Sequence, residues 1–410
     1  MHLRHLFASL LLSLPVFAET QLPPNSRVAI IGDSITEQKL YSRFIETYLL
    51  ACTGRQDIKC FQFGWSGETA QGFSQRLEND LDVFKPTVAT TCYGMNDGRY
   101  VPYDPSIGAN YEKWMRLVLT KLKEVGVKNI VAGSPGAVDT RWFVKQSATA
   151  DQYNDNLAHL RDVDRKLATE FQTAFADVHA EMINAMGPAK AKLGADYDVG
   201  GRDGVHPGAN GHLLMAAAFL KGLGLDGNIG EITVDMTGAS TGSEGHTVSG
   251  SKGTAEIESS KWPFYLEPET RKITEFCKFN EELNRYTLRV KNLEAAKAKV
   301  TWGTETKEFT KEQLTTGINL AAEFTKSPFD APFIKLATAV SAKQAYETPM
   351  IKAMITNFRN FANDAKDDPE FATALNTLKQ KMMAKQEKLD VDAHAKLVPV
   401  KHTIKVESLK

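Results

Sequence analysis

The sequence predicts an α/β protein, with a three-layer α/β/α domain on a parallel sheet, then a β-rich domain that carries a helical hairpin. Between residues 27 and 223, apolar runs of strand length alternate with amphipathic helical stretches, as in a parallel sheet covered on both faces. After residue 226 the chain changes to short alternating pieces separated by Gly, Ser and Thr, a texture typical of antiparallel sheets. A chain of 410 residues also exceeds the usual size of one hydrophobic core.

Five strands and five helices are expected in the first domain, which we place at residues 19–225. The predicted strands are residues 27–31, 58–63, 87–93, 129–132 and 174–178. Amphipathic helices are expected near residues 37–50, 72–84, 110–125, 152–170 and 211–223.

The remainder of the chain is expected to form a sandwich-like β-rich domain over residues 226–340 and a helical hairpin over residues 341–395. Met350, Met354 and Phe358 lie on one apolar helical stripe. Asp368 and Pro369 are suited to the cap and the first position of the second helix. Residues 396–410 are expected to return to the β-rich domain as a terminal strand.

The first 18 residues indicate a secretory signal peptide. A positively charged start is followed by an apolar stretch over residues 6–17 and by Ala18, near which cleavage is expected. The protein is therefore expected to be secreted or periplasmic. Export would permit a disulfide between Cys52 and Cys60, but the sequence leaves this pairing open.

Net charge and hydropathy exclude some classes of partner. The formal net charge is −1, so no bulk charge favours nucleic acid or an anionic membrane surface. No segment beyond the signal peptide approaches the ~20 apolar residues of a membrane helix, so no membrane insertion is expected. The sequence does not indicate an oligomeric state.

Four short motifs carry groups that can do chemistry. Ser34 follows the first predicted strand, Gly67 the second and Asn96 the third, whereas Asp203 and His206 precede the last helix. The carboxyl ends of parallel strands meet at one edge of a sheet. We therefore expect these five residues to gather there.

Together these groups are those needed for nucleophilic catalysis by a serine. His206 can remove the proton of Ser34 during attack, and Asp203 can orient the imidazole. The backbone N–H groups of Ser34 and Gly67 and the amide of Asn96 can stabilise an oxyanion. This chemistry requires no cofactor, and no Cys/His spacing resembles a metal site.

These motifs resemble those of the SGNH hydrolases, also called the GDSL esterase/lipase family, over about residues 27–223. The resemblance implies a flavodoxin-like sheet, a catalytic triad of Ser34, Asp203 and His206, and an oxyanion hole formed by Ser34, Gly67 and Asn96. Ile35 stands where the family name implies leucine, and Gln62 where asparagine is frequent. Neither departure removes a catalytic group.

Two other pairs of residues deserve comparison with this set. Asp177 and His179 also form an acid–histidine pair, but they sit two apart at the end of a predicted strand, and we rank this pair far below Asp203 and His206. Asp33 and Asp97 resemble the carboxylate pair of a glycosidase. We expect them instead to hold the turns that carry Ser34 and Asn96.

The resulting hypothesis is a secreted serine esterase that cleaves carboxylic esters through an acyl-enzyme, with an O-acetylated carbohydrate as the first choice of substrate. Lipase or lysophospholipase activity and thioesterase or arylesterase activity are alternatives within the same family. A glycan-binding or scaffold protein with incidental esterase activity is an alternative of a different class. Aromatic residues near the motifs are candidates for stacking on a sugar: Trp65, Tyr93, Tyr100, Tyr103 and Trp142.

Overall fold

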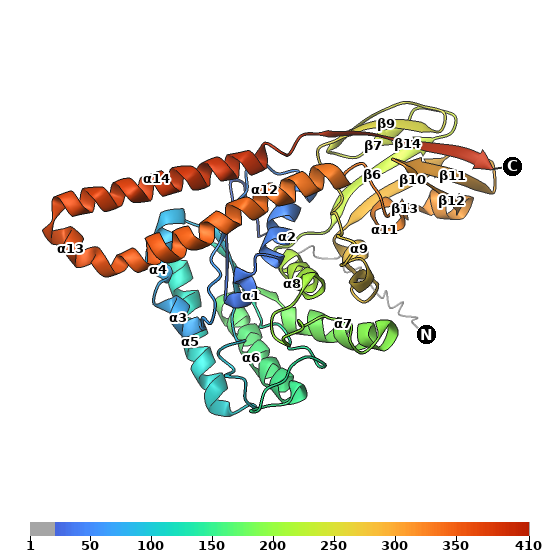
Figure 1. Ribbon diagram of the computed structural model, residues 1–410. Coiled ribbons are helices and arrows are strands. Elements are labelled where there is room, and N and C mark those ends of the chain that lie inside the picture. Colours follow the sequence, from blue (N-terminus) through green and yellow to red (C-terminus); the bar gives the residue numbers. More distant parts are fainter. Residues whose placement is uncertain (1–20, 410) are drawn as a thin grey trace, which may run out of the picture.

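A five-stranded parallel sheet forms the centre of the N-terminal part of the computed structural model, which describes residues 21–409 (Figure 1). The predicted signal peptide lies outside the described residues. The strand order is β2-β1-β3-β4-β5, and every neighbouring pair is parallel. The strands are β1 (Arg27–Gly32), β2 (Lys59–Gln62), β3 (Val88–Cys92), β4 (Asn129–Gly133) and β5 (Ala174–Ala176). This is the flavodoxin-like order, in which ligands bind at the carboxyl ends of β1 and β3.

Helices cover both faces of this sheet, as predicted. Along β1, Val28 and Ile30 enter one apolar cluster whereas Ala29 and Ile31 enter the other, because alternate residues of a strand point to opposite faces. The first cluster receives α2 (Tyr41–Thr47), the π-helical turn η1 (Tyr48–Cys52), α7 (Val178–Leu193) and α8 (Ala209–Gly222). The second receives α3 (Ala70–Ser74), α4 (Leu77–Phe84), α5 (Pro105–Glu124) and part of α6 (Ala150–Phe171).

Helix α7 was not expected from the sequence. The strand predicted to reach residue 178 ends at Ala176, and Asp177 caps α7 by accepting the backbone N–H of Ala180. Gly187 and Pro188 lie inside this helix. Both residues disfavour a helix interior, which is why the sequence pattern did not reveal it.

Two further sheets form the β-rich part. One has the order β13-β10-β6-β7 and the other β12-β11-β14-β9-β8. The pair β6–β10 is parallel, in contrast to the antiparallel arrangement that the sequence suggested. The strands are β6 (Asn228–Asp235), β7 (Thr241–Gly242), β8 (His246–Ser249), β9 (Thr254–Ser259), β10 (Arg285–Lys291), β11 (Lys297–Trp302), β12 (Glu305–Thr310), β13 (Ile318–Asn319) and β14 (Val400–Leu409). Short helices connect them: α9 (Phe279–Glu282), α10 (Lys311–Thr316) and α11 (Leu320–Glu323).

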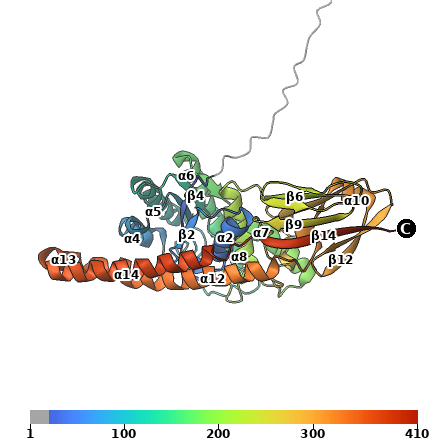
Figure 2. The ribbon, with the colours of Figure 1, turned by 90° about the horizontal axis from the view of Figure 1, so that it is seen from above.

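A long helical hairpin, here called the arm, runs along the α/β part and extends past it (Figures 1 and 2). Its outgoing limb is α12 (Asp330–Pro349), a π-helical turn η3 (Met350–Thr356) and a 3-10 turn η4 (Asn357–Phe361). It turns at α13 (Ala362–Asp367) and returns as α14 (Pro369–His394). The arm therefore begins at residue 330 and not at residue 341. The chain then re-enters the β-rich part as β14, between β9 and β11.

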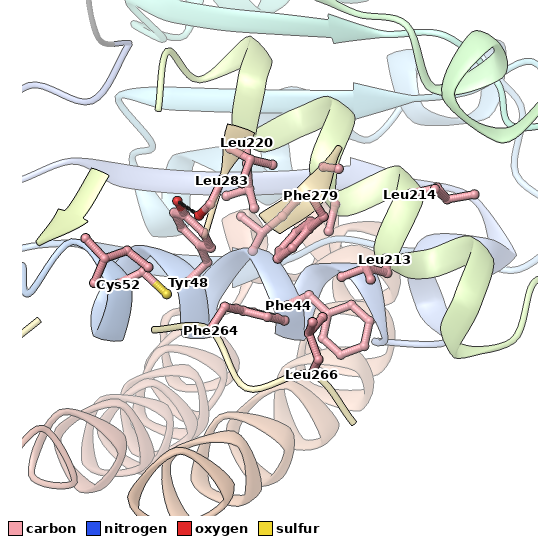
Figure 3. Packing of buried hydrophobic residues seen from close by; sticks show 14 of the residues in the cluster. Phe44, Tyr48, Cys52, Leu213, Leu214, Leu220, Phe264, Leu266, Phe279 and Leu283 are labelled. Carbon is pink, nitrogen blue, oxygen red and sulfur yellow. Dashed lines mark hydrogen bonds between the residues drawn. The ribbon is translucent and has the colours of Figure 1, made fainter. Parts of the chain in front are cut away.

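One continuous apolar core joins the α/β part to the β-rich part. Figure 3 shows Phe44 and Tyr48 packed beside Leu220 and against Phe264 and Phe279, which come from the segment that links β9 and β10. The Tyr48 hydroxyl donates to the carbonyl of Leu283 at 2.6 Å. The two parts consequently share a hydrophobic interior.

Cys52 and Cys60 are both buried and free, so the disulfide that the sequence left open is not formed. Among residues 21–409, no helix has the length and apolar character that a membrane crossing requires.

Candidate active site

Ser34 lies at a sharp junction between β1 and the short helix α1 (Ser34–Glu37). Asp33 caps α1 by accepting the backbone N–H of Ile35 at 2.9 Å. Gly32 ends the strand where a Cβ atom would lie 2.1 Å from Oγ1 of Thr36 and 2.8 Å from the carbonyl oxygen of Cys92. Only glycine fits there, and the tight junction leaves Ser34 partly exposed at the carboxyl end of the sheet.

Ser34, His206 and Asp203 are joined by two short hydrogen bonds. Oγ of Ser34 lies 2.8 Å from Nε2 of His206, and Nδ1 of His206 lies 2.6 Å from Oδ2 of Asp203. Oδ1 of Asp203 accepts the backbone N–H groups of Val205 at 2.9 Å and His206 at 2.8 Å. Asp203 and His206 are thus held together within one tight turn.

The charge state of Asp203 fixes the tautomer of His206. Partial burial raises the pKa of Asp203, but the hydrogen bonds from His206 and Val205 outweigh burial and hold this pKa below its usual value. The carboxylate is therefore ionised at neutral pH and accepts a hydrogen bond from the N–H at Nδ1 of His206. Nε2 is left free to accept the Ser34 hydroxyl proton, as a general base must.

Gly67 and Asn96 lie on neighbouring loops that follow β2 and β3. Gly67 has a φ of +74°, and a Cβ atom on it would meet nothing within 4 Å. Its left-handed backbone, and not steric crowding by the protein, therefore favours glycine. Nδ2 of Asn96 donates to the carbonyl of Glu68 at 3.0 Å, and Oδ1 accepts the hydroxyl of Tyr100 at 3.0 Å. The amide is oriented from both sides and retains one N–H.

The rival residue pairs do not form sites. Asp177 caps α7 and forms an ion pair with Arg165, whereas Nδ1 of the buried His179 lies 3.1 Å from the carbonyl of Gly136. Asp33 and Asp97 are both buried against backbone amides: Asp97 accepts the N–H groups of Ala70 and Gly94, each at 3.1 Å. Burial raises the pKa of Asp33 to about 7 and that of Asp97 to about 6.

Glu68 and Arg76, which the sequence did not single out, support the loops around Ser34. Arg76 contacts both carboxylate oxygens of Glu68, at 2.6 and 2.7 Å, and the Tyr93 hydroxyl donates to Glu68 at 2.8 Å. Tyr100, which the sequence named only as a candidate for stacking, adopts a φ of 59°, unusual for a residue with a side chain. Glu68 adjoins Gly67, which is the only signal that marked it.

The candidate aromatic residues have different environments. Tyr93 is fully buried, and Tyr103 stacks on His159 with ring centroids 3.8 Å apart. The cationic groups of Arg76 and Lys352 lie over the ring of Trp65, each 4.8 Å from its centroid. Trp142 is half-buried, and Arg202, the neighbour of Asp203, lies 5.5 Å from its ring centroid.

Comparison with known proteins agrees with this geometry. The model of the GDSL-like Lipase/Acylhydrolase family matches residues 30–214. An acetylxylan esterase from Geobacillus stearothermophilus is 25% identical over 222 residues, which cover 49% of this chain and 94% of that protein. A solved structure of acetylxylan esterase from the same organism covers 50% of this chain and 97% of its own, with 24% identity and a TM-score of 0.41.

The likeness of fold extends beyond the matched residues. The structure of a gut microbial diltiazem-metabolizing enzyme covers 94% of this chain and 98% of its own, with a TM-score of 0.72 and 20% identity. The α/β part, the β-rich part and the arm therefore recur together in another protein.

Proposed function

We propose that this chain, a GDSL-like serine hydrolase of ester bonds over residues 30–214, is a secreted esterase that works through an acyl-enzyme on Ser34. The observation that carries the proposal is the unbroken series of hydrogen bonds from Ser34 through His206 to Asp203, at 2.8 and 2.6 Å. An activated nucleophile, its base and the group that orients the base are all in contact before any substrate binds.

The first half of the reaction forms the acyl-enzyme. Oγ of Ser34 attacks the ester carbonyl carbon while its proton passes to Nε2 of His206. The carbonyl oxygen becomes an oxyanion that accepts hydrogen bonds from the N–H groups of Ser34 and Gly67 and from Nδ2 of Asn96. When the carbon–oxygen bond to the alcohol breaks, His206 returns the proton to the departing alcohol oxygen.

The second half of the reaction releases the acid. Water attacks the acyl carbon, and its proton passes to Nε2 of His206. The tetrahedral intermediate collapses, the bond to Oγ of Ser34 breaks, and the serine recovers its proton from His206. Throughout the cycle Asp203 stays ionised and stabilises the imidazolium.

The proposed substrate is an O-acetylated carbohydrate. The support is the 25% identity to an acetylxylan esterase over nearly the whole length of that protein, together with an aromatic ring and an arginine, Trp142 and Arg202, beside Asp203. Secretion is proposed from the charged and apolar pattern of residues 1–18. A secreted enzyme would meet such a polymer outside the cytoplasm.

Replacing Ser34 with alanine tests the reaction class. Because the hydroxyl is the nucleophile, we expect Ser34→Ala to lower kcat for p-nitrophenyl acetate by roughly 10⁴-fold or more. Thermal unfolding followed by circular dichroism should match the wild type, because the only side-chain hydrogen bond of Ser34 within residues 21–409 is to His206. A folded variant with wild-type turnover would disprove the assignment.

A panel of acyl esters tests the substrate class. We expect p-nitrophenyl acetate to be cleaved with a higher kcat/KM than the octanoyl and palmitoyl esters, and acetate to be released from acetylated xylooligosaccharides. Deacetylated oligosaccharides serve as the blank. Rising kcat/KM with chain length, without acetate release from the sugar, would instead favour a lipase.

A further inference from the structure

The carboxylate of Glu37 connects three parts of the molecule that meet beside Ser34. Glu37 is the last residue of α1, the helix that Ser34 begins. Its Oε2 accepts the backbone N–H of Ser66 and also the Ser66 hydroxyl, at 2.6 Å. Both of its oxygens contact Nζ of Lys352 on the arm, at 2.8 and 2.9 Å.

We propose that Glu37 is a positioning residue for the N–H of Gly67, and that Lys352 makes the arm a working part of the ester-hydrolysing site. The inference rests on the proposed function, because it assumes that Gly67 donates to the oxyanion. It assigns to the C-terminal half of the chain a role in catalysis that none of the motifs around Ser34 indicates.

The loop that carries Gly67, here the Gly67 loop (residues 63–69), is held at several points. The N–H of Trp65 donates to the carbonyl of Gly32 at 3.0 Å, which anchors the loop beside the end of β1. Ser66 and Gly67 themselves are exposed. The N–H of Glu68 donates to the carbonyl of Trp65 at 3.1 Å and closes the turn around Ser66 and Gly67. Among residues 21–409, Glu37 is the side chain that hydrogen-bonds Ser66, so it contributes to the direction of the neighbouring Gly67 N–H.

The same carboxylate also sets the spacing between two oxyanion donors. The N–H of Ser34 belongs to α1, and the N–H of Gly67 belongs to the loop that Glu37 grips. Because donors must be held within about 0.5 Å of their productive positions, which lie about 2.7–3.1 Å from the developing oxyanion, a bond between helix and loop maintains the geometry that the reaction needs.

Lys352 reaches Glu37 from the π-helical turn η3 of the arm. Such turns are frequent at functional sites. The turn is fixed on both sides, because Oγ1 of Thr348 lies 3.2 Å from Oε1 of Gln62 and the Thr356 hydroxyl donates to Asp80 at 2.8 Å. Nζ of Lys352 also lies 4.8 Å from the ring centroid of Trp65. Through Lys352 the arm consequently contacts both the carboxylate of Glu37 and the ring of Trp65 in the Gly67 loop.

This ion pair is partly buried, because the side chains of Lys352 and Glu37 are 26% and 19% exposed. Removing one partner should therefore cost some folding stability, so each variant is compared with the wild type by thermal unfolding. We expect the variants to stay folded and the donor to loosen. A displacement of about 1 Å in catalytic geometry lowers rates by up to about 10²-fold.

The test compares Lys352→Met, Glu37→Leu and Lys352→Arg with a matched control, Glu387→Gln. Glu387 forms another ion pair between the arm and the α/β part, 2.5 Å from Nζ of Lys59. Lys59 is the first residue of β2, so this pair lies at the end of the strand opposite the Gly67 loop. kcat and KM are measured with p-nitrophenyl acetate. The inhibition constant of a boronic acid, which forms a tetrahedral adduct with an active serine, reports on the oxyanion donors.

We expect Lys352→Met and Glu37→Leu to lower kcat about tenfold or more, with KM within about twofold, and to weaken boronic acid binding by a similar factor. Lys352→Arg, which can still contact both oxygens, should restore most of kcat. In the double variant Lys352→Met and Glu37→Leu, kcat should fall no further than in Glu37→Leu alone, because both residues act through one contact. Glu387→Gln should match the wild type.

Wild-type kcat and boronic acid binding in a folded Lys352→Met protein would overturn the proposal. So would a loss of kcat that a serine-reactive phosphonate titration traces entirely to fewer active molecules, since that result indicates partial unfolding. The outcome is separable from the proposed function, because an inactive Ser34→Ala variant would still establish the nucleophile if Lys352 proved irrelevant.

Discussion

At the scale of single residues, the amide of Asn96 is the most tightly constrained of the proposed oxyanion donors. The carbonyl of Glu68 accepts one of its N–H groups, and the hydroxyl of Tyr100 satisfies its oxygen. Tyr100 is itself fixed by stacking on Tyr153, with ring centroids 5.0 Å apart. The second N–H is therefore held ready without reorganisation during the reaction, which is the condition for strong transition-state stabilisation.

Replacing Asn96 with alanine should therefore impair the chemical step more than substrate binding. We expect kcat for p-nitrophenyl acetate to fall by about 10²–10³-fold, the usual cost of removing one oxyanion donor, with KM little changed. The control is Asp155→Asn, on the surface of α6. Asn79 on α4 is exposed too, but it contacts the arm and is therefore not used. An Asn96→Ala enzyme with wild-type kcat would remove Asn96 from the oxyanion hole.

The contacts of His206 with Ser34 and Asp203 could be expected from the sequence, because each of these residues lies in a short segment at the end of a strand or before a helix. The roles of Gly67 and Asn96 as oxyanion donors stay predictions. The supporting contacts around these residues could not be predicted. Lys352 reaches Glu37 across 315 positions of sequence, and no local pattern records such a contact. Tyr100 depends on a left-handed backbone that only the folded loop imposes.

At the scale of elements, the helices α5 and α6 meet through a buried acid. Oδ2 of Asp164 accepts the Tyr111 hydroxyl at 2.8 Å, and Oδ1 has no hydrogen-bond partner among residues 21–409. Burial raises the pKa of Asp164 well above its usual value. The folded protein therefore keeps this proton to a higher pH than the unfolded chain, which ionises near pH 4.

This difference predicts how stability depends on pH. Between about pH 4 and the raised pKa of the folded state, the folded protein binds up to one more proton at Asp164 than the unfolded chain. This residue therefore lowers the free energy of unfolding as pH rises through that range, by up to about 1.4 kcal/mol per pH unit. Asp164→Asn should remove that contribution, so the variant should gain stability relative to the wild type as pH rises above about 4. Urea denaturation at several pH values measures this. A difference that does not change with pH would show that Asp164 is ionised when folded.

The sequence revealed elements to the extent that their apolar pattern was regular. Strands β1 to β4 lie within one or two residues of the predicted positions because they are short apolar runs buried on both faces. The start of α12 was placed too late, at residue 341. The apolar stripe of the missed turns, Phe333, Leu336 and Val340, is followed on the same helix by Lys343, Gln344 and Glu347, all fully buried. These polar residues interrupt the apolar periodicity, so the two parts were not recognised as one helix.

At the scale of the whole molecule, these three polar residues explain how the arm is attached. Nζ of Lys343 contacts Glu46 of α2 at 3.0 Å and Glu347 at 2.8 Å, and the Lys343 side chain is fully buried. Gln344 donates to Glu46 at 2.7 Å. Burial, the largest influence, raises the pKa of Glu46 to about 7. Without the arm, Glu46 would lose both of these partners.

The α/β part is therefore not expected to fold independently of the rest of the chain. Truncation after residue 225 would expose the apolar surface that Phe44 and Tyr48 share with Phe264 and would leave Glu46 unpaired. We expect residues 19–225 alone to be insoluble or to lack cooperative thermal unfolding. A stable, active fragment would instead support a separable binding module, the alternative in which the C-terminal half serves mainly to attach a polymer.

Shortening the arm gives the matched comparison. None of residues 360–376 is buried, and Phe361 is 46% exposed, whereas Met350 and Ile351 pack into the α/β core. Replacing residues 360–376 with a short Gly-Ser linker keeps Lys343 and Lys352 in place. Because tolerance to deletion follows burial, we expect this protein to unfold cooperatively near the wild-type temperature and to keep its kcat for p-nitrophenyl acetate. Loss of turnover in the shortened but folded protein would show that the outer end of the arm, and not only the segment around Lys352, is needed at the active site.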